Sequence, residues 1–372
     1  MPSTKKITVS VISDLTTDQR VIRICTTLQL MGFDVMVIAR SFKNSLPLDN
    51  YSFNATRINC IFRKGILQYA EFNLKLFFKL FFCKSDYFLA NDLDVLIPNY
   101  IVTKIRKKKI FYDTHEYFTG VPELKNSHLK RKTWKFFEDW IFPKLPVVYT
   151  INDSVKNKYN AEYKKEITVV RNVPITALPS KSPLPLAMQN KIILLLQGAG
   201  INIGRGGLEL LKAMQFLPNN YYLIFVGSGT QWQEIKKERV ALNLLHNTEM
   251  IDKVPPAKLK EYTACANIGF SLDSFNDLNC LYNLPNKIFD YIHANVPIIA
   301  TAIPEVKRIV EDYNCGICLT NYEPQNIANT ILDLVADKER YNMYKNNCTT
   351  AAKELCWENE SKKIIDIYTP YL

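Results

Sequence analysis

Glycine is scarce in this sequence, at 12 of 372 residues, which excludes a collagen-like chain. Charged residues make up 22% against 47% hydrophobic residues, a balance that excludes a disordered or coiled-coil chain. No uninterrupted apolar run approaches the roughly 18 residues that span a bilayer, and the opening MPSTKKITVSVISD lacks a signal peptide's long apolar core. Nine cysteines, an odd number without a secretory signal, favour thiols in a reducing cytoplasm over a disulfide framework.

The length predicts two domains, and the charge divides unevenly between them. Residues 1–172 hold 28 Lys and Arg against 16 Asp and Glu, whereas residues 173–372 hold 19 against 20. The whole positive excess therefore lies in the first half. Such asymmetry indicates an anionic partner for that half, with a merely soluble basic surface as the alternative.

Strand-length apolar runs alternate with helix-length segments in both halves, which predicts parallel sheets covered on both faces. In the first half the expected strands are Ile7–Ser13, Asp34–Ala39, Tyr87–Ala90, Lys109–Asp113, Val147–Thr150 and Ile167–Val170. A proline-rich stretch, residues 173–190, is expected to be a linker between an acceptor-side domain at 1–172 and a second domain at 191–350. Residues 351–372 are expected to form a C-terminal helix. Whether this helix packs back on the first domain is left open by the sequence.

A glycine-rich turn follows the first expected strand of the second domain, in Gln197-Gly-Ala-Gly-Ile-Asn-Ile-Gly-Arg-Gly-Gly207. Gly204 and Gly206 would let backbone N–H groups approach a phosphate, and Arg205 adds a planar donor. Gly227 ends the next strand. The spacing differs from the dinucleotide fingerprint, and no Lys-Ser/Thr pair follows as in a P-loop. The segment indicates a phosphate site, with a tight strand–helix turn as the alternative.

A second anion site is expected where Pro285 precedes a helix. The first amides of that helix, from Asn286 to Ile288, lack intrahelical partners and can bind an anion. Lys287 would meet a phosphate, while Asp290, one turn later on the same side, could accept two ribose hydroxyls. The alternative is that Asp290 merely suits the electrostatics of a helix N-terminus.

The segment LPNKIFDYIHANVPIIAT, residues 284–301, resembles the P-x-K-[LF]-x-E-Y-x-A-x-G-x-P-V-I-A segment of GT-B glycosyltransferases. The resemblance is closest to the retaining family-4-like group, which includes bacterial polysaccharide and glycan-type enzymes. GRGGLELLKAM, FVGSGT and the opening SDLTTDQRVIRICTTLQLMGFDVMVIAR resemble further segments of that family in order and spacing, so the resemblance covers nearly the whole chain. It implies two doubly wound, Rossmann-like α/β domains facing each other across a cleft.

The resemblance assigns roles in the second domain residue by residue. Asp290 matches the second acid of the family's E-x7-E motif, which implies binding of the nucleotide ribose, and Arg205 matches a phosphate-binding lysine. Lys287 and the neighbouring amides fall beside the donor diphosphate. Three positions depart from the pattern, because Tyr282 stands at the first acid, Gly200 stands at a usual arginine and the second acid is shortened to Asp at Asp290.

The first domain supplies the expected catalytic residues at the end of the strand in Phe111-Tyr-Asp-Thr-His-Glu-Tyr117. These residues are Asp113, His115 and Glu116. His115 resembles the family's histidine at this strand end, which implies contact with the donor sugar or the reaction centre; a structural histidine is the alternative. Asp14 and Arg20 occupy the place of the family's first glycine-rich loop, here without glycine, and are expected to face the acceptor.

Two other patterns suggest metal or redox chemistry, but each has a simpler reading. Asp92-Leu-Asp94 resembles the metal-binding D-x-D of GT-A transferases, yet that pattern is common by chance and two successive α/β domains argue against the GT-A plan. Cys315-Gly-Ile-Cys318 has no second pair or nearby histidine to complete a zinc site. No metal site and no cofactor are therefore expected.

Basic and apolar residues interleave in the first half. Phe72–Lys84 places Lys75 and Lys79 among phenylalanines and leucines, and Lys104–Lys109 and Lys125–Lys135 add cationic stretches. Apolar area and positive charge together favour peripheral contact with an anionic membrane. A core helix with two solvated lysines is the alternative, and no recognised nucleic-acid-binding module accompanies the charge.

The sequence therefore predicts a cytoplasmic hexosyltransferase that uses no metal. Attachment of the enzyme to the inner face of the membrane is a further possibility. The enzyme would move a sugar from a nucleoside diphosphate to a glycan or lipid-linked acceptor, with retention implied by the resemblance. A nucleotide-sugar epimerase on the same fold and a non-catalytic basic glycan- or nucleotide-binding protein remain alternatives. An NAD-dependent oxidoreductase is disfavoured by the glycine spacing.

Overall fold

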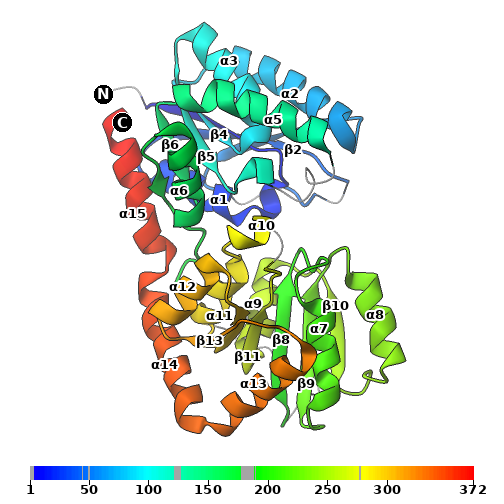
Figure 1. Cartoon of the computed structure of the whole chain (residues 1–372). Helices are drawn as coiled ribbons and strands as arrows, with labels where there is room; N and C mark the ends of the chain where they lie inside the picture. The colour runs from blue at the N-terminus through cyan, green and yellow to red at the C-terminus, as the bar shows by residue number, and fades with distance from the viewer. Residues whose placement is uncertain are drawn as a thin grey trace. The chain divides into compact units, whose positions relative to one another are not determined.

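The structure is a computed structural model of the chain, described over residues 4–43, 45–48, 51–120, 127–176, 188, 190–275 and 278–372. The chain forms two compact units (Figure 1). Unit 1 comprises residues 1–172 together with 357–372, and unit 2 comprises residues 173–356. Most of the expected linker, residues 173–190, lies outside the described residues.

Unit 1 is built on a seven-stranded sheet in the order β3-β2-β1-β4-β5-β6-β7, with every neighbouring pair parallel. The strands are β1 (Lys6–Ser10), β2 (Asp34–Arg40), β3 (Asn54–Ile58), β4 (Tyr87–Asn91), β5 (Lys109–Thr114), β6 (Val147–Thr150) and β7 (Thr168–Val169). The central strands are buried along almost their whole length, as expected for a parallel sheet covered on both faces.

Helices connect the consecutive strands of unit 1 except β2 and β3, between which the described residues contain no helix. They are α1 (Gln19–Leu30), α2 (Gly65–Phe82), α3 (Leu96–Arg106), α5 (His128–Ile141) and α6 (Asp153–Tyr163), with short 3-10 turns η1 (Leu15–Thr17), η2 (Leu93–Val95), η3 (Phe118–Gly120) and η4 (Phe142–Lys144). Asp18 caps α1 by accepting a hydrogen bond from the Val21 amide at 3.1 Å.

The last helix, α15 (Trp357–Tyr368), packs in unit 1 although the preceding helix belongs to unit 2. The Trp357 indole donates a hydrogen bond to the Thr27 hydroxyl at 3.1 Å, and the Tyr368 ring stacks on Phe111 with centroids 4.3 Å apart. A short 3-10 turn, η7 (Thr369–Tyr371), follows. The expected boundary at residue 351 differs, because residues 351–354 still belong to α14 and the helical break comes at residues 355–356.

Unit 2 carries a six-stranded parallel sheet in the order β10-β9-β8-β11-β12-β13. Its strands are β8 (Ile192–Gly198), β9 (Tyr221–Gly227), β10 (Thr248–Asp252), β11 (Ile268–Ser271), β12 (Ile298–Thr301) and β13 (Gly316–Leu319). Its helices are α7 (Gly207–Ala213), η6 (Met214–Phe216), α8 (Trp232–Ala241), α9 (Pro256–Cys265), α10 (Leu278–Leu281), α11 (Asn286–His293), α12 (Pro304–Asp312), α13 (Pro324–Ala336) and α14 (Lys338–Glu354).

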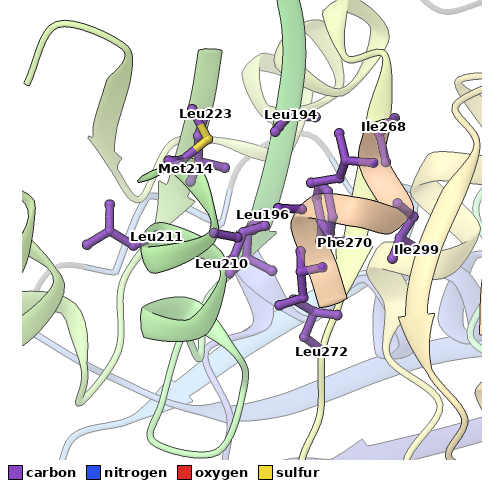
Figure 2. Packing of buried hydrophobic residues seen from close by; sticks show 14 of the residues in the cluster. Leu194, Leu196, Leu210, Leu211, Met214, Leu223, Ile268, Phe270, Leu272 and Ile299 are labelled. Carbon is purple, nitrogen blue, oxygen red and sulfur yellow. The ribbon is translucent and has the colours of Figure 1, made fainter. Parts of the chain in front are cut away.

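The sheet of unit 2 is buried on both faces because side chains along a strand alternate between them. Leu194 and Leu196 of β8 pack in one core cluster, seen in Figure 2 with Leu210, Phe270 and other side chains. Ile193 and Leu195 pack in the cluster on the opposite face. Apolar burial on both faces explains why β8 reads as an unbroken apolar run.

The prediction of two doubly wound parallel sheets is confirmed. Two edge strands were not predicted, β3 with the sequence NATRI and β10 with TEMID. Both are only partly buried and carry polar residues, so neither shows the apolar run that marks the central strands. Among the described residues, no helix combines the length and the apolar character needed to cross a membrane.

Candidate active site

In unit 1, Arg20 of α1 forms a buried ion pair with Asp113 near the end of β5. Its Nε and Nη2 atoms donate to the two carboxylate oxygens of Asp113 at 2.8 and 2.6 Å, and its Nη1 donates to the Val170 carbonyl at 2.7 Å. The Arg20 side chain is 2% exposed and that of Asp113 is fully buried. Arg20 therefore does not present its guanidinium to solvent, in contrast to its expected acceptor-facing position.

His115 lies between the carboxylates of Asp113, near the end of β5, and Asp92, directly after the neighbouring strand β4. Its Nε2 atom is 3.1 Å from Asp113 Oδ2, and its Nδ1 atom is 3.2 Å from Asp92 Oδ2. The His115 amide also donates to Asp92 Oδ1 at 2.7 Å, and the Asp92 amide donates to the Asp113 carbonyl at 2.8 Å. The imidazole is thus fixed at both nitrogens while remaining 19% exposed.

The backbone of Asp92 is left-handed, with φ of 66°, a region that non-glycine residues rarely adopt. That conformation accompanies the three contacts that Asp92 makes with Asp113 and His115. Strained backbone of this kind persists where surrounding contacts determine it, and it gathers at functional sites.

These carboxylates favour the charged form of His115. Burial alone would lower the pKa of the imidazole, but the negative charges of Asp92 and Asp113 outweigh it and raise the pKa to about 9. Burial would also raise the pKa of the Asp113 carboxyl, yet Arg20 and His115 hold it below its ordinary value. Near neutral pH the strand ends of unit 1 therefore hold an imidazolium between two carboxylates.

The other two first-unit candidates, Glu116 and Asp14, make further contacts in unit 1. Glu116 is half-buried, and its backbone carbonyl accepts a hydrogen bond from the Thr114 hydroxyl at 2.8 Å. Asp14 accepts hydrogen bonds from Thr16 and from the Ser45 hydroxyl, the latter at 2.7 Å, and pairs with Arg57 at 3.3 Å. These contacts fix the turn that contains Asp14, and they lower the pKa of its carboxyl although burial opposes the shift.

The two carboxylates of the D-x-D pattern, Asp92 and Asp94, have different surroundings. Asp92 contacts His115, whereas Asp94 is buried in η2 with its Oδ1 atom lacking a hydrogen-bond partner within the described ranges. Burial raises the pKa of the Asp94 carboxyl well above its ordinary value. The residues described contain no cluster of three or more His, Cys, Asp or Glu arranged to hold a metal ion.

In unit 2 the glycines of the turn after β8 permit close backbone approach. Gly206 has φ of 70° and immediately precedes α7; a Cβ there would lie 2.2 Å from the Leu272 Cβ. A Cβ at Gly227 would lie 1.8 Å from the Gly198 carbonyl oxygen. Gly204 also has positive φ, at 80°, and its carbonyl accepts from the Ser274 amide at 2.8 Å. The glycines thus hold this turn against the ends of β9 and β11.

Two cations of unit 2 gather around the buried carboxylate of Asp273. Arg205 Nη1 donates to Asp273 Oδ1 at 2.8 Å, and the side chain of Arg205 is 18% exposed. The second carboxylate oxygen, Oδ2, is buried and has no hydrogen-bond partner among the residues that the structure describes. Lys287, at the start of α11, has its pKa lowered by burial and by Arg205, while Asp273 opposes the shift. Two cations near one carboxylate leave a net positive charge suited to an anion.

Asp290 lies one turn into α11 and is held by the end of β8. The Gln197 side-chain Nε2 donates to Asp290 Oδ2 at 3.0 Å, while the side-chain Oε1 of Gln197 accepts from the Thr263 hydroxyl at 2.7 Å. The Tyr291 hydroxyl donates to the Leu195 carbonyl at 3.1 Å and so ties α11 to the same strand. Asn286, Lys287 and Asp290 therefore occupy one fixed helix end. The Ile288 amide was expected to lack a partner, but it donates to the Pro285 carbonyl at 3.1 Å because the first turn of α11 closes on that residue.

Three residues that hold the candidate residues in place were not singled out for these roles from the sequence: Asp92 in unit 1, and Gln197 and Asp273 in unit 2. Each lies at or just after the carboxyl end of a parallel strand, where ligand sites form in such folds. That position was the available signal. Their partners lie 23, 93 and 68 positions away along the chain, so sequence spacing did not reveal the pairs.

Comparison with known proteins agrees with this architecture. Residues 194–350 match the family described as glycosyl transferases group 1. Sucrose-phosphate synthase from Thermosynechococcus elongatus superposes with a TM-score of 0.80 at 15% identity, over 98% of each chain. HepE from Anabaena, solved with UDP and glucose, superposes with a TM-score of 0.79 at 15% identity, over 98% of this chain and 100% of that one.

A putative UDP-N-acetylglucosamine 2-epimerase from Listeria monocytogenes has the same fold with a TM-score of 0.68 at 12% identity, over 99% of this chain and 97% of that one. No curated protein matches the chain in sequence. The resemblance to GT-B glycosyltransferases is thereby confirmed, in sequence for most of unit 2 and in fold for the whole chain.

Proposed function

We propose that this protein is a hexosyltransferase that moves a sugar from a uridine diphosphate donor to a glycan or lipid-linked acceptor. The observation that carries the proposal is the positive group of Arg205 and Lys287 beside Asp273, next to a helix start that presents Asp290. These residues lie within the segment that matches the glycosyl transferases group 1 family. The choice of uridine is supported by the fold-related HepE, which was solved with UDP-glucose.

Donor binding is assigned to unit 2. Arg205, Lys287 and the N-terminal end of α11 would bind the diphosphate, because cations and the positive end of a helix dipole both attract anions. Asp290 would accept the ribose hydroxyls, with Gln197 holding its carboxylate in place. Gly206 and Gly227 allow the backbone at Leu272 and Gly198 to approach closely, and Gly204 supplies the positive φ of the same turn.

Catalysis would rest on stabilising the charge that develops on the leaving diphosphate. Arg205 and Lys287 supply fixed positive charge for this purpose, so the reaction proposed here needs no metal. His115 takes the role that the family resemblance implies, contact with the donor sugar or the reacting centre, as an imidazolium held by Asp92 and Asp113. Retention follows from the same resemblance, with the leaving diphosphate deprotonating the acceptor on the same face.

The departures at Tyr282 and Gly200 and the fold shared with an epimerase leave two alternatives to test. Incubating the protein with a panel of UDP-sugars and mixed glycan or lipid-linked acceptors, followed by mass spectrometry, distinguishes them. A transferase releases UDP and adds one hexose mass to an acceptor. An epimerase converts the donor into an isomer of the same mass, which chromatography before the mass spectrometer separates from the substrate, and it releases no UDP. A binding protein does neither; either result would refute the proposal.

His115→Ala provides the internal control for the same assay. Contact with the reacting centre predicts a fall in kcat with little change in the affinity for UDP, because interactions made only in the transition state appear in kcat. A variant with wild-type kcat would reduce His115 to a structural histidine.

A further inference from the structure

Helix α2 exposes an apolar stripe. Its inward side chains, Phe72, Leu76 and Leu80, are fully buried. On the opposite side Phe78 and Phe82 are 51% and 76% exposed, and they continue a line of exposed leucines at positions 67 and 74. A helix that is apolar on both sides is either buried by its neighbours or lies at an interface. Because α2 is not buried on its outer side, that side has the character of an interfacial surface.

The apolar surface continues on the two neighbouring helices. Helices α2 and α3 pack together, as do α3 and α5, and Figure 1 shows the three side by side. The Tyr69 and Trp134 rings meet edge to face with centroids 5.6 Å apart and join α2 to α5. The exposed apolar side chains of α3 and α5 are Ile105, Leu129, Phe136 and Trp140. We call the exposed side chains of residues 63–84, 104–109 and 128–144 the outer face of unit 1.

This outer face is strongly basic. Its three ranges contain 15 Lys and Arg residues against only three acids. All three acids are already paired, Glu71 with Lys75 and both Glu138 and Asp139 with Lys135. Along α5, an open groove of about 590 Å³ is lined, among the described residues, by His128, Arg131, Lys132, Lys135, Phe136 and Asp139. Carboxylates outside the three ranges also pair with this face, Asp86 with Lys108 and Glu162 with Lys135, but they are few against 15 basic residues. A large excess of positive charge therefore surrounds the exposed aromatic rings.

We propose that the outer face of unit 1 docks on the surface of an anionic lipid bilayer. The rings of Phe78, Phe82 and Phe136 would enter the boundary between headgroups and acyl chains, while lysines and arginines meet the lipid phosphates. Charge complementarity selects this occupant. A second copy of the chain would place two basic faces against each other, and a nucleic acid would leave the leucines of α2 exposed to water.

Sedimentation with vesicles tests the docking. The full-length protein should pellet with vesicles of equal parts phosphatidylcholine and phosphatidylglycerol and stay in solution with phosphatidylcholine alone. Replacing three basic residues of α5, as Lys130→Gln, Arg131→Gln and Lys132→Gln together, should weaken the anionic binding about a hundredfold, since each charge near the surface contributes about fivefold. The double variant Phe78→Ser and Phe82→Ser should also weaken it and should make the remaining binding more salt-sensitive.

Matched variants in unit 2 separate docking from general effects of charge and hydrophobicity. The charge control is the triple variant Lys237→Gln, Lys253→Gln and Lys260→Gln, and the apolar control is Ile203→Ser with Phe216→Ser, whose side chains are 75% and 47% exposed. Neither control should alter vesicle binding.

Several outcomes would overturn the proposal. The first two are equal pelleting with neutral and anionic vesicles and no pelleting with either. The third is a loss of vesicle binding in the control variants as large as in the variants of the outer face. The last is that self-association of the protein, or added RNA, abolishes its binding to the vesicles. The assay contains no nucleotide sugar, so its result is independent of whether the chain transfers sugar.

Discussion

Asp92 holds His115 at two points, through the backbone amide at 2.7 Å and through Nδ1 at 3.2 Å. Asp113 holds the other ring nitrogen and is itself fixed by the buried guanidinium of Arg20. The histidine expected from the sequence to be catalytic is therefore the partly exposed end of a series of ion pairs that leads through Asp113 to the buried Arg20. Several measurable consequences depend on these ion pairs.

Replacing Asp92 by Asn should lower the pKa of His115 from about 9 towards its ordinary value, because one of the two carboxylates that favour the imidazolium is lost. NMR titration of the ring resonances measures the shift directly. Asp86→Asn, which removes a more exposed carboxylate just before β4, is the control and should leave the titration unchanged. An unaltered pKa in Asp92→Asn would contradict the observed geometry.

The same pairing should make stability depend on pH. Because the pKa of His115 is raised from 6.5 to about 9 on folding, its contribution is complete below about pH 6.5 and is lost as the pH rises through about 9. Urea unfolding gives the free energy of unfolding of wild type and of His115→Gln. The difference between these two free energies should be larger by on the order of 2 kcal/mol at the lower end of this pH window than at the upper end. A difference that stays constant across the window would exclude the imidazolium.

Arg20→Gln should destabilise unit 1 by about 3–5 kcal/mol, because it leaves the buried Asp113 carboxylate without its cation. The double variant Arg20→Met with Asp113→Leu should be less destabilised than the single one, since it removes both charges. Lys6→Gln, which breaks an exposed pair with Asp34, should cost less than about 1 kcal/mol. Urea unfolding compares the three, and a small effect of Arg20→Gln would be inconsistent with a buried pair.

The contributions of the diphosphate and the ribose to donor binding can be measured separately. Arg205→Ala should weaken binding of both UDP and inorganic diphosphate, with losses of about ten- to hundredfold expected for a charge-assisted contact. Asp290→Ala should weaken binding of UDP by a similar factor and leave inorganic diphosphate unaffected. Lys212→Ala, on the exposed side of α7, is the matched control. Calorimetry with unchanged UDP affinity in both variants would refute the assignment.

Gly206→Ala should destabilise unit 2 more than Gly65→Ala destabilises unit 1. Both positions have positive φ, at 70° and 76°, which costs a residue with a Cβ about 1–2 kcal/mol. Only at Gly206 would the added Cβ also meet Leu272, at 2.2 Å, whereas at Gly65 nothing lies within 4 Å. Thermal unfolding of the two variants separates backbone strain from the steric clash; equal shifts would show that Leu272 moves aside freely.

The sequence alone determined the two parallel sheets, because strands buried on both faces leave unbroken apolar runs such as that of β8. It did not reveal β3 and β10, whose edge positions leave them partly exposed and polar. The glycine-rich turn and the segment around Lys287 could likewise be recognised locally. A turn with positive φ and the start of a helix each depend on neighbouring residues.

Tertiary structure alone decided which charges meet. Arg20 and Asp113 lie 93 positions apart, as do Gln197 and Asp290, and no local pattern couples them. Each pair joins a helix to the end of a strand, α1 to β5 and α11 to β8, so it forms only when the helix packs at that end of the sheet. Burial then makes pairing obligatory because an unpaired charge is costly there. The sequence thus named Arg20 as a residue that faces a ligand, and only the packing of α1 against β5 made it the buried support of Asp113.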